Sequence, residues 1–308
     1  MDEGPRTAQM VSIRNESSVH PLAFVALLLG NLALAVGPFL VRHSGVGPIS
    51  AGFWRMALAV PFLFAIAWMV KTPVRWPGRK AGIAIAIAAF LFAADLAAWH
   101  KGILLTKLGN ATLFGNISSF IFAAWGLWLA RQLPTPVQAL ALLLAAAGCA
   151  LLMWGSAELS AAHLRGDLLA ALAGLLYAGY LIAVDDTRRT LAPMPLLFLA
   201  SLLGAAMLLP AAVASGETFA PTDWSALFAL ALCSQVVGQG LLVFALGQVP
   251  PLVVGIAMLT QPALSAFLGW RFYGEGLTVL DGLGAAMIVV ALVLVRLRPR
   301  PQLGRAGA

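Results

Sequence analysis

The sequence contains few charged residues and only two cysteines. Charged residues make up 10% of the 308 residues and hydrophobic residues 61%, which leaves no stretch that could form a soluble catalytic domain. Cys149 and Cys233 lie in apolar surroundings, so we interpret them as small buried residues and not as a disulfide or a metal-binding pair. The four histidines are scattered and lack the spacing of metal ligands.

Motifs of nucleotide and hydrolytic chemistry are also missing. The sequence has no Walker A phosphate-binding motif, no HExxH motif and no GxSxG motif. It therefore gives no support to ATP-driven transport by this chain, or to protease or hydrolase activity. No apolar stretch carries the regularly spaced arginines of a voltage sensor. We predict no enzymatic activity, no metal site and no cofactor.

Ten apolar stretches fill the sequence between its two ends. Each is close to the roughly 20 residues that a helix needs to cross the hydrocarbon core of a bilayer. Such a segment forms a helix because its backbone N–H and C=O groups must hydrogen-bond to each other in lipid. The sequence therefore predicts an all-α polytopic membrane protein with ten transmembrane helices. The predicted spans are 21–41, 49–70, 81–101, 108–130, 136–155, 167–187, 195–214, 223–246, 251–271 and 278–297. The polar first 20 residues lack an apolar core, so we expect no cleavable signal peptide.

The net charge of +7 is distributed unevenly between the connecting segments. If residues 1–20 are cytoplasmic, thirteen Lys and Arg residues fall on the cytoplasmic side and five on the outside. An excess of Lys and Arg in short loops marks the cytoplasmic side. We therefore predict a bacterial-type inner (plasma) membrane protein with both termini in the cytoplasm. Anionic lipid head groups are the expected counter-charges, and no nucleic-acid partner is expected.

The two halves of the chain resemble each other when one is shifted by 143 residues. Residues 141–153 then fall on 284–296, and Ser118 falls on Gln261. Five helices per half, an odd number, make the second copy enter the membrane from the opposite side, as in the inverted repeats of secondary transporters. The predicted organisation is a cytoplasmic tail at 1–20, five-helix repeats at 21–155 and 156–297, and a cytoplasmic tail at 298–308.

Four segments carry a resemblance to a known family. They are GPISAGFWRMAL (47–58), FAADLAAWHKGILLTKLGNATLFGNISSF (92–120), GDLLAALAGLLYAGY (166–180) and LTQPALSAFLGWRFYGEGLTVLDGLGAAMIVVAL (259–292). On these segments the chain resembles the ten-helix EamA-type branch of the drug/metabolite transporter (DMT) superfamily, over residues 21–297. It departs from the family's pattern in the first half, where Ser119 replaces the usual proline and Gln132 the usual glutamate. Within the superfamily it most resembles the YddG-like exporters of aromatic amino acids.

The resemblance implies a secondary transporter that works by alternating access. It implies export of amino acids with aromatic or hydrophobic side chains, or of related small metabolites, through a central cavity. Lipid-linked, nucleotide-sugar or cationic drug substrates are an alternative within the same superfamily, and a membrane enzyme is a remote alternative from another class. The expected partners are a small-molecule substrate and membrane lipid, and we expect the chain to act as a monomer.

Two charged residues lie more than one helical turn inside the predicted spans. A charge at the centre of a membrane helix costs about 2.5–3.5 kcal/mol on insertion scales, so each such residue needs a reason. Arg55 lies about two turns into the 49–70 span and Asp95 less than two turns from the end of the 81–101 span. We predict that they pair in the outer leaflet. The pair is either a static ion pair that anchors two helices, or a gate or coupling group near the external mouth.

The 108–130 and 251–271 spans carry the polar residues most typical of a cavity. These candidates are Asn116, Ser118, Ser119, Thr260 and Gln261. Pro262 lacks an amide hydrogen and its ring disturbs the carbonyl group of Met258, so a helix kink would free this carbonyl for substrate or water. Hydrogen bonds between helices are the alternative interpretation of these polar residues.

Further candidates for the cavity lie in three other spans. Tyr177 and Tyr180, and likewise Gln235 and Gln239, share a helical face because of their i, i+3 and i, i+4 spacing. The resemblance implies that their spans line the cavity, whereas the spacing alone is equally compatible with a packed face. Asn31 is similar, as a polar residue in an otherwise apolar run.

The 81–101 span ends in three side chains with both apolar and polar parts. Trp99 is either an anchor at the membrane interface or a wall of the substrate pocket. His100 and Lys101 are expected at the membrane surface, because such side chains can reach the interface from the end of a helix.

Overall fold

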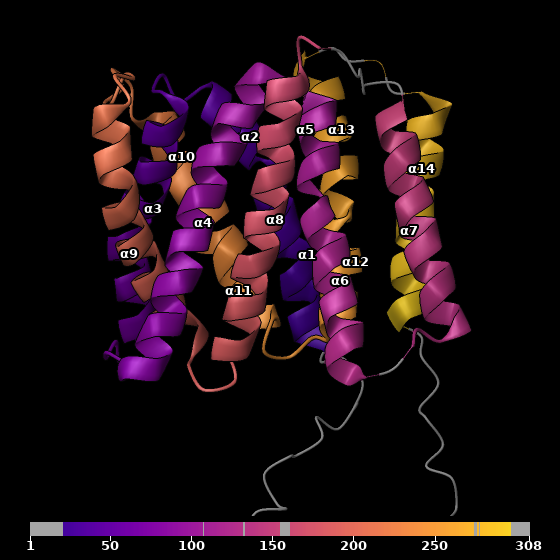
Figure 1. Ribbon diagram of the computed structural model, residues 1–308, viewed down its shortest axis with the longest axis horizontal. Helices are drawn as coiled ribbons and strands as arrows, with labels where there is room; N and C mark the ends of the chain where they lie inside the picture. The colour runs from indigo at the N-terminus through magenta and orange to yellow at the C-terminus, as the bar shows by residue number, and fades with distance from the viewer. Residues whose placement is uncertain are drawn as a thin grey trace, which may run out of the picture.

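The computed structural model describes residues 21–106, 108–131, 133–154, 161–273, 276 and 278–296 of the chain. Across these residues the chain is a bundle of helices without strands (Figure 1). The predicted tails at 1–20 and 298–308, and Gln132, lie outside the described residues.

The helices of the described chain correspond to the ten predicted spans. The first five are α1 (Pro21–Ala35) with α2 (Gly37–Arg42), α3 (Pro48–Met69), α4 (Arg79–Leu105), α5 (Leu108–Gly115) with α6 (Ile117–Ala130), and α7 (Pro136–Trp154). The next two are α8 (Leu164–Thr187) and α9 (Pro193–Ala214). The last three are α10 (Ser225–Leu230) with the π-helix η1 (Ala231–Gln239) and α11 (Gly240–Ala245), α12 (Pro251–Met258) with α13 (Thr260–Tyr273), and α14 (Val279–Arg296).

The lengths of these helices fit a membrane protein. In the described chain, eight helical units are long and apolar enough to cross a membrane, and shorter apolar helices at Pro136–Leu152 and Pro251–Leu264 complete the ten. Proline occupies the first turn of α3, α9 and α12, where its missing amide hydrogen breaks no helical hydrogen bond. The predicted all-α polytopic membrane fold is confirmed.

The two ends of the described chain lie on the same side of the bundle. α1 begins and α14 ends at the lower side in Figure 1. We call this side the terminal face and the other side the opposite face. α8, the first helix of the second half, begins at the opposite face, so the two halves run through the bundle in opposite orientations.

The 143-residue shift reappears in the helix boundaries. α5, α6 and α7 correspond to α12, α13 and α14, whose first residues are each 143 positions later in the chain. The packing follows the same relation, since α3 packs on α9, α6 on α12 and α7 on α14, while α4 packs on α8 and α1 on η1 and α11. The two inverted repeats therefore meet helix by helix, as a pseudo-two-fold axis in the membrane plane requires.

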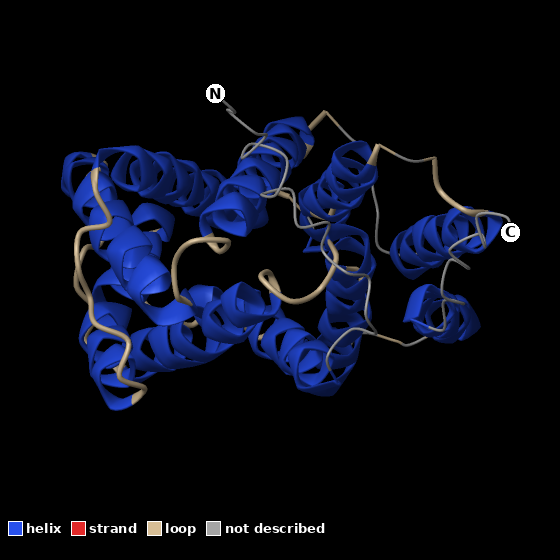
Figure 2. Cartoon of the chain, turned by 90° about the horizontal axis from the view of Figure 1, so that it is seen from below, coloured by secondary structure: helices blue, strands red, loops and turns tan. Residues whose placement is uncertain are grey.

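α7 and α14 form a pair at one edge of the bundle (Figures 1 and 2). A Cβ atom on Gly148 would lie 2.6 Å from the carbonyl oxygen of Gly284, and one on Gly284 equally close to that of Gly148. Only glycine allows two membrane helices to approach this closely. The role of this pair is therefore helix packing, away from the centre of the bundle.

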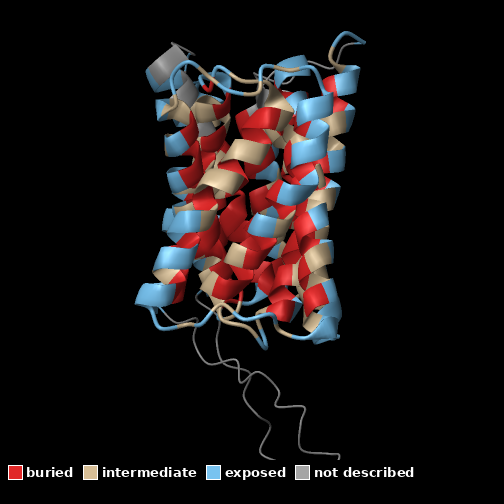
Figure 3. Cartoon of the chain, turned by 90° about the vertical axis from the view of Figure 1, so that its left-hand side faces the viewer, coloured by how far each residue is buried: buried red, intermediate tan, exposed pale blue. Residues whose placement is uncertain are grey.

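The outer surface of the bundle is apolar. Figure 3 shows exposed positions on the outside of the helices around a buried interior, and Trp68 and Leu143 are 78% and 68% exposed. Lipid is as apolar as a leucine side chain, so such residues gain little from burial. An apolar residue can therefore lie on the outside of the bundle. Cys149 is buried as predicted, whereas Cys233 is exposed, so the prediction is wrong for Cys233.

Candidate functional site

A cavity lies between the two repeats. Its volume is about 110 Å³. One water molecule needs about 10–15 Å³, so the cavity has room for a small solute. Its lining comes from α1 to α6 in the first repeat and from α8, η1, α12 and α13 in the second. This is the position in which transporters with inverted repeats bind their substrates.

The cavity extends from the middle of the bundle toward the opposite face. Arg55 follows the first residue of α3 by seven positions, which places it roughly 10 Å from the opposite face at 1.5 Å per residue. Tyr177 follows the first residue of α8 by thirteen positions, or roughly 20 Å. Both side chains line the cavity, so its depth covers about 10 Å of a hydrocarbon core that is about 30 Å thick.

Two helix breaks meet at the cavity. The helix of the first repeat is interrupted at Asn116, between α5 and α6, and its counterpart in the second repeat at Leu259, between α12 and α13. These positions are related by the 143-residue shift. The break at Leu259 follows the Met258 carbonyl group that Pro262 is predicted to disturb.

Polar side chains at these breaks donate to backbone carbonyl groups of the preceding turn, and the Thr112 carbonyl group also accepts from the backbone amide of Asn116 at 3.0 Å. Asn116 donates from Nδ2 to the carbonyl oxygen of Thr112 at 2.7 Å, and Ser118 donates from Oγ to that of Gly115 at 2.9 Å. In the second repeat, Thr260 donates from Oγ1 to the carbonyl oxygen of Ala257 at 2.7 Å. The first repeat breaks without a proline, since the equivalent of Pro262 is Ser119.

Asn31 connects α1 to the break in the second repeat. Its Nδ2 donates to the carbonyl oxygen of Ala257 at 3.0 Å, and its Oδ1 accepts a hydrogen bond from Gln261 Nε2 at 3.1 Å. Asn31 is fully buried, whereas Gln261 lines the cavity. The helix break is therefore held to α1 by two hydrogen bonds.

An aromatic wall forms one side of the cavity. The rings of Phe92 and Tyr180 stack with centroids 4.5 Å apart, and Tyr177 stacks on Tyr180 at 5.6 Å. Gln239 bridges the two hydroxyl groups, because it donates to Tyr177 at 3.0 Å and accepts from Tyr180 at 3.4 Å. Trp99 extends the aromatic lining toward the opposite face.

Arg55 is a buried cation whose guanidinium group reaches the second repeat. Its Nε donates to Gln235 Oε1 at 3.1 Å, and Gln235 in turn donates to Ser201 Oγ at 3.0 Å. Its Cζ lies 5.6 Å from the centroid of the Phe92 ring, within the range of a cation–π interaction. Only 7% of the residue is exposed.

The predicted ion pair between Arg55 and Asp95 does not form. Among the described residues, no hydrogen bond or ion pair joins the two side chains, although both line the cavity and Asp95 is only 8% exposed. The physical reason is that Gln235, fixed by Ser201, holds the guanidinium group toward the second repeat. The cavity therefore contains a cation and an anion that do not neutralise each other by contact.

The surface position predicted for His100 is also wrong. The residue is 1% exposed, and its Nδ1 lies 3.0 Å from the carbonyl oxygen of Pro48 at the start of α3. α4 continues to Leu105, beyond the predicted end of the span at 101, so His100 lies deeper than expected and faces the bundle. Lys101, on the neighbouring face, is exposed as predicted.

The cavity is closed toward the terminal face. All eight residues of α12 are buried. A Cβ atom on Gly255 would lie 2.9 Å from the Cβ of Ala123 and closer still to the carbonyl oxygen of Ser119. A Cβ on Gly126 would lie 2.9 Å from the backbone nitrogen of Leu252. α6 and α12 therefore pack backbone to backbone in this half of the bundle.

An arginine connects two helix ends at each face. At the terminal face, Arg188 follows α8 and donates from Nε to the carbonyl oxygen of Val243 in α11 at 2.9 Å, and from Nη1 to that of Leu191. At the opposite face, Arg42 ends α2 and donates from Nη2 to the carbonyl oxygen of Ile103 in α4 at 3.3 Å. Val243 and Ile103 each lie two residues before the end of their helix. The two contacts thus join corresponding helices of the two repeats, although the 143-residue shift places Ile103 on Leu246 and not on Val243.

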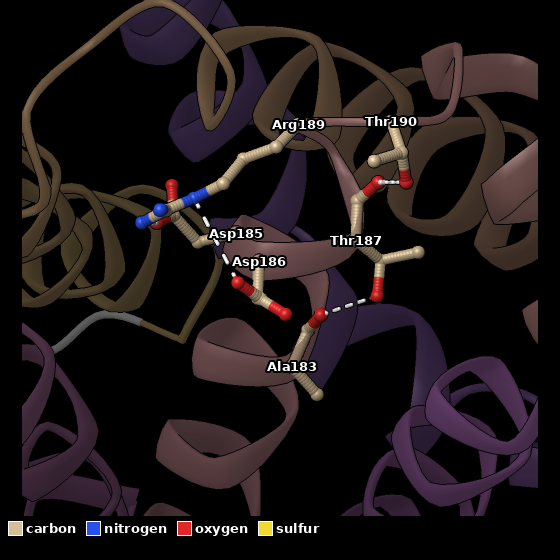
Figure 4. Close-up of polar contacts among 6 residues, drawn as sticks. All are labelled: Ala183, Asp185, Asp186, Thr187, Arg189 and Thr190. Atoms are coloured by element: carbon tan, nitrogen blue, oxygen red, sulfur yellow. Dashed lines mark hydrogen bonds and ion pairs between the residues drawn. The ribbon is translucent and has the colours of Figure 1, made fainter. Parts of the chain in front are cut away.

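Two acidic residues lie beside the contact at the terminal face. Figure 4 shows Arg189 reaching back along α8 toward Asp185 and Asp186, each with a nitrogen–oxygen distance of 3.8 Å. Thr187 Oγ1 donates to the carbonyl oxygen of Ala183 at 2.7 Å in the same turn. The side chain of Asp185 is 1% exposed and that of Asp186 75% exposed. Contacts among neighbouring side chains and backbone groups therefore stabilise the last turn of α8.

The structure divides the predicted site residues into two groups. Those that line the cavity are Arg55, Asp95, Trp99, Asn116, Ser118, Tyr177, Gln239 and Gln261. Those that lie behind its walls are Asn31, Ser119, Tyr180, Gln235 and Thr260. Most of the second group support the lining through the hydrogen bonds and stacking described above.

Sequence reasoning missed several lining residues. Phe92 lies three positions before Asp95 and so shares its helical face, which is a signal that could have identified it. Gly115 and Gly174 give no such signal. A Cβ on Gly115 would meet the Trp99 ring, and one on Gly174 would lie 2.8 Å from the Phe114 carbonyl oxygen. Within the described part of the chain, no three His, Cys, Asp or Glu side chains come together as they would in a metal site.

A bundle of apolar helices in two inverted repeats, with a polar cavity between them, defines a membrane transporter of small molecules. The sequence profile of the EamA-like transporter family matches residues 21–154 and 164–297. The chain therefore belongs to the EamA-like transporter family, as the resemblance predicted.

Individual proteins also show similarity to the chain. It is 30% identical over 117 residues to "Putative cobalt transport protein CbiM 2" of Methanocorpusculum labreanum. That alignment covers 37% of this chain and 47% of the relative, so the chain spans about half the length of the curated relative it matches. A protein of known crystal structure superposes with a TM-score of 0.69 over 89% of this chain and 94% of that protein, at 18% identity. This second likeness shows the fold alone.

Proposed function

We propose that the chain is a secondary transporter that exports amino acids with aromatic or hydrophobic side chains across a bacterial-type inner membrane. The observation that carries this proposal is the cavity between the repeats, which combines an aromatic wall with one cation and one anion. Phe92, Trp99 and Tyr177 offer faces to an apolar side chain, and Arg55 and Asp95 offer charges to polar groups of the same molecule. Pockets for small molecules generally combine an apolar lining with a few polar groups that fix orientation.

The size and charge of the cavity favour an amino acid over the alternative substrates. Its volume of about 110 Å³ is well below the roughly 300–1,000 Å³ of sites for drug-sized ligands. Lipid-linked and nucleotide-sugar substrates carry phosphate groups, which are commonly bound by several cations, whereas Arg55 is the one Lys or Arg in the described lining. A cationic drug would meet Asp95 but would also be repelled by Arg55.

The proposed orientation places the terminal face in the cytoplasm. The distribution of Lys and Arg supports this orientation by the positive-inside rule. The cavity then extends toward the periplasm and is closed toward the cytoplasm by α6 and α12. Alternating access would require these two helices to separate in the second half of the transport cycle. We expect the monomer to be sufficient, because both repeats that line the cavity belong to one chain.

Counterflow in liposomes tests the proposal. Purified protein is reconstituted in vesicles loaded with unlabelled phenylalanine, leucine or tryptophan, and uptake of the labelled amino acid is followed. Protein-dependent, saturable counterflow is the expected result. The panel includes UDP-sugars, an organic cation and Co²⁺, the last because of the name of the relative from Methanocorpusculum labreanum. Counterflow of one of these compounds without any counterflow of amino acids would refute the proposal.

A further inference from the structure

We infer that Arg55 and Asp95 form the two poles of a binding site for a zwitterion, with Arg55 binding the α-carboxylate and Asp95 the α-ammonium group of the substrate. This inference rests on the proposed function, which names amino acids but assigns no group of the substrate to a residue. It follows from the way in which the two charged side chains are held apart within one cavity.

Arg55 has the geometry of a carboxylate receptor with part of its binding capacity unused. A guanidinium group has five N–H donors arranged in a planar fork that matches a carboxylate. In the described structure only Nε is engaged, by Gln235, and the terminal nitrogens have no hydrogen-bond partner. Gln235 and the Phe92 ring fix the plane of the group. A substrate carboxylate would find the fork already oriented.

Asp95 is the opposite charge in the same cavity, and it has no contacting partner among the described residues. Its carboxylate lies in the cavity lining with 8% exposure, and no described residue donates a hydrogen bond or forms an ion pair with it. A buried charge without a contacting partner is costly inside a membrane protein and marks a candidate functional site. An ammonium group is the partner that supplies both opposite charge and hydrogen-bond donors to a carboxylate.

The surroundings of Asp95 indicate where the rest of the substrate lies. Phe92 and Trp99 are at positions three before and four after Asp95, so all three share one face of α4. A substrate whose ammonium group binds Asp95 would therefore extend its apolar side chain along an aromatic surface. A molecule with both charges satisfies both poles at once, whereas an amine or an acid leaves one buried charge unpaired.

Three labelled probes separate the two poles. They are L-phenylalanine, 2-phenylethylamine, which lacks the carboxylate, and 3-phenylpropionate, which lacks the ammonium group. Binding of each to the purified full-length protein is measured by scintillation proximity. We expect the wild type to bind phenylalanine at least about tenfold more tightly than either analogue, the smallest factor expected for a hydrogen bond to a charged group.

Two substitutions should change the preference in a crossed pattern. Arg55→Gln should weaken phenylalanine binding at least about tenfold, but it should not weaken binding of 2-phenylethylamine, which has no carboxylate and is repelled by Arg55. Asp95→Asn should weaken phenylalanine binding to the same extent, but it should not weaken binding of 3-phenylpropionate, which has no ammonium group and is repelled by Asp95. Arg189→Gln and Asp186→Asn remove the same charges outside the cavity, at side chains that are 49% and 75% exposed, and should leave all three affinities unaltered.

The outcomes distinguish this inference from the proposed function. If the wild type binds phenylalanine no better than the two analogues, the assignment of the substrate's charged groups to Arg55 and Asp95 is refuted, but the proposed transport of amino acids is not. Equal weakening of all three probes by Arg55→Gln would show a structural role and overturn the inference. If the wild type binds none of the probes and shows no amino-acid counterflow, both proposals fail. Arg55→Lys, which keeps the charge but not the fork, replaces Arg55→Gln if that variant does not fold, and should also lose preference for phenylalanine over 2-phenylethylamine.

Discussion

Gly255 is the position where the closure of the terminal face is most sensitive to added volume. It lies in α12, and an added Cβ would come within 2.9 Å of the Ala123 Cβ and closer to the Ser119 carbonyl oxygen. Backbone atoms cannot rotate away from this contact as a flexible side chain could. Gly255→Ala should therefore force α6 and α12 apart.

The expected magnitude follows from a comparison with a second glycine of the same chain. Inserting a methyl group into a packed interior costs about 1–3 kcal/mol, while alanine gains about 1 kcal/mol over glycine within a helix. Gly282 lies in α14 and has no atom within 4 Å of its added Cβ, so Gly282→Ala receives the helical gain alone. Because the helical gain is similar in both variants, their free energies of unfolding should differ by about 1–3 kcal/mol, which is the cost of the contact at Gly255.

Unfolding in mixed detergent micelles measures this difference. Both variants and the wild type are titrated with a denaturing detergent, and their free energies of unfolding are compared. Gly255→Ala should be less stable than Gly282→Ala by the amount given above. Equal stability of the two variants would refute the conclusion that α6 and α12 are in backbone contact. Because this contact closes the cavity, Gly255→Ala should also raise labelling of the cavity from the terminal face.

Three further predictions concern other contacts. Asn31→Leu removes both hydrogen bonds between α1 and the break in the second repeat, and should destabilise the protein by about 1 kcal/mol at the average of about 0.6 kcal/mol per bond in membranes, as measured by unfolding in micelles. Arg188→Gln should speed hydrogen exchange at the end of α11, because about 1–3 kcal/mol is lost when buried carbonyl groups lose their donor, whereas Arg189→Gln, at an exposed side chain, should not. Hydrogen bonds from the amide and hydroxyl of Ser225 lower the pKa of Asp223 from its ordinary value of 3.8. This carboxylate therefore stabilises the start of α10 above pH 3.8 and loses the effect as the pH falls through the lowered pKa, so melting curves of Asp223→Asn and wild type should differ at pH 7 and converge in acid.

The sequence predicted the helices well because membrane spans depend on length and apolarity. Hydrophobic runs and the 143-residue shift were sufficient for ten spans in two repeats. The break at Leu259 also had a local signal in Pro262. The break at Asn116 had none, since Ser119 replaces the proline there, and only the symmetry of the repeats could have indicated it.

The contacts of the site were harder to predict because they depend on the rotation of each helix about its axis. Depth in the membrane can be counted along the chain, and it placed Arg55 and Asp95 correctly in the same half of the bundle. Whether two side chains at similar depth touch depends on angles that composition does not determine. Arg55 thus bonds to Gln235 in the other repeat. His100 was misplaced for a simpler reason, because α4 continues for four residues beyond the predicted end of the span.

The arginine contacts at the two faces have a consequence for the energetics of transport. Arg42 and Arg188 make the same kind of bond between corresponding helices of the inverted repeats. A rearrangement that exchanges the conformations of the repeats would also exchange these bonds, so that what is lost at one face is regained at the other. Two end states related in this way differ little in free energy. A substrate with only a modest difference in affinity between them is then sufficient to shift their populations.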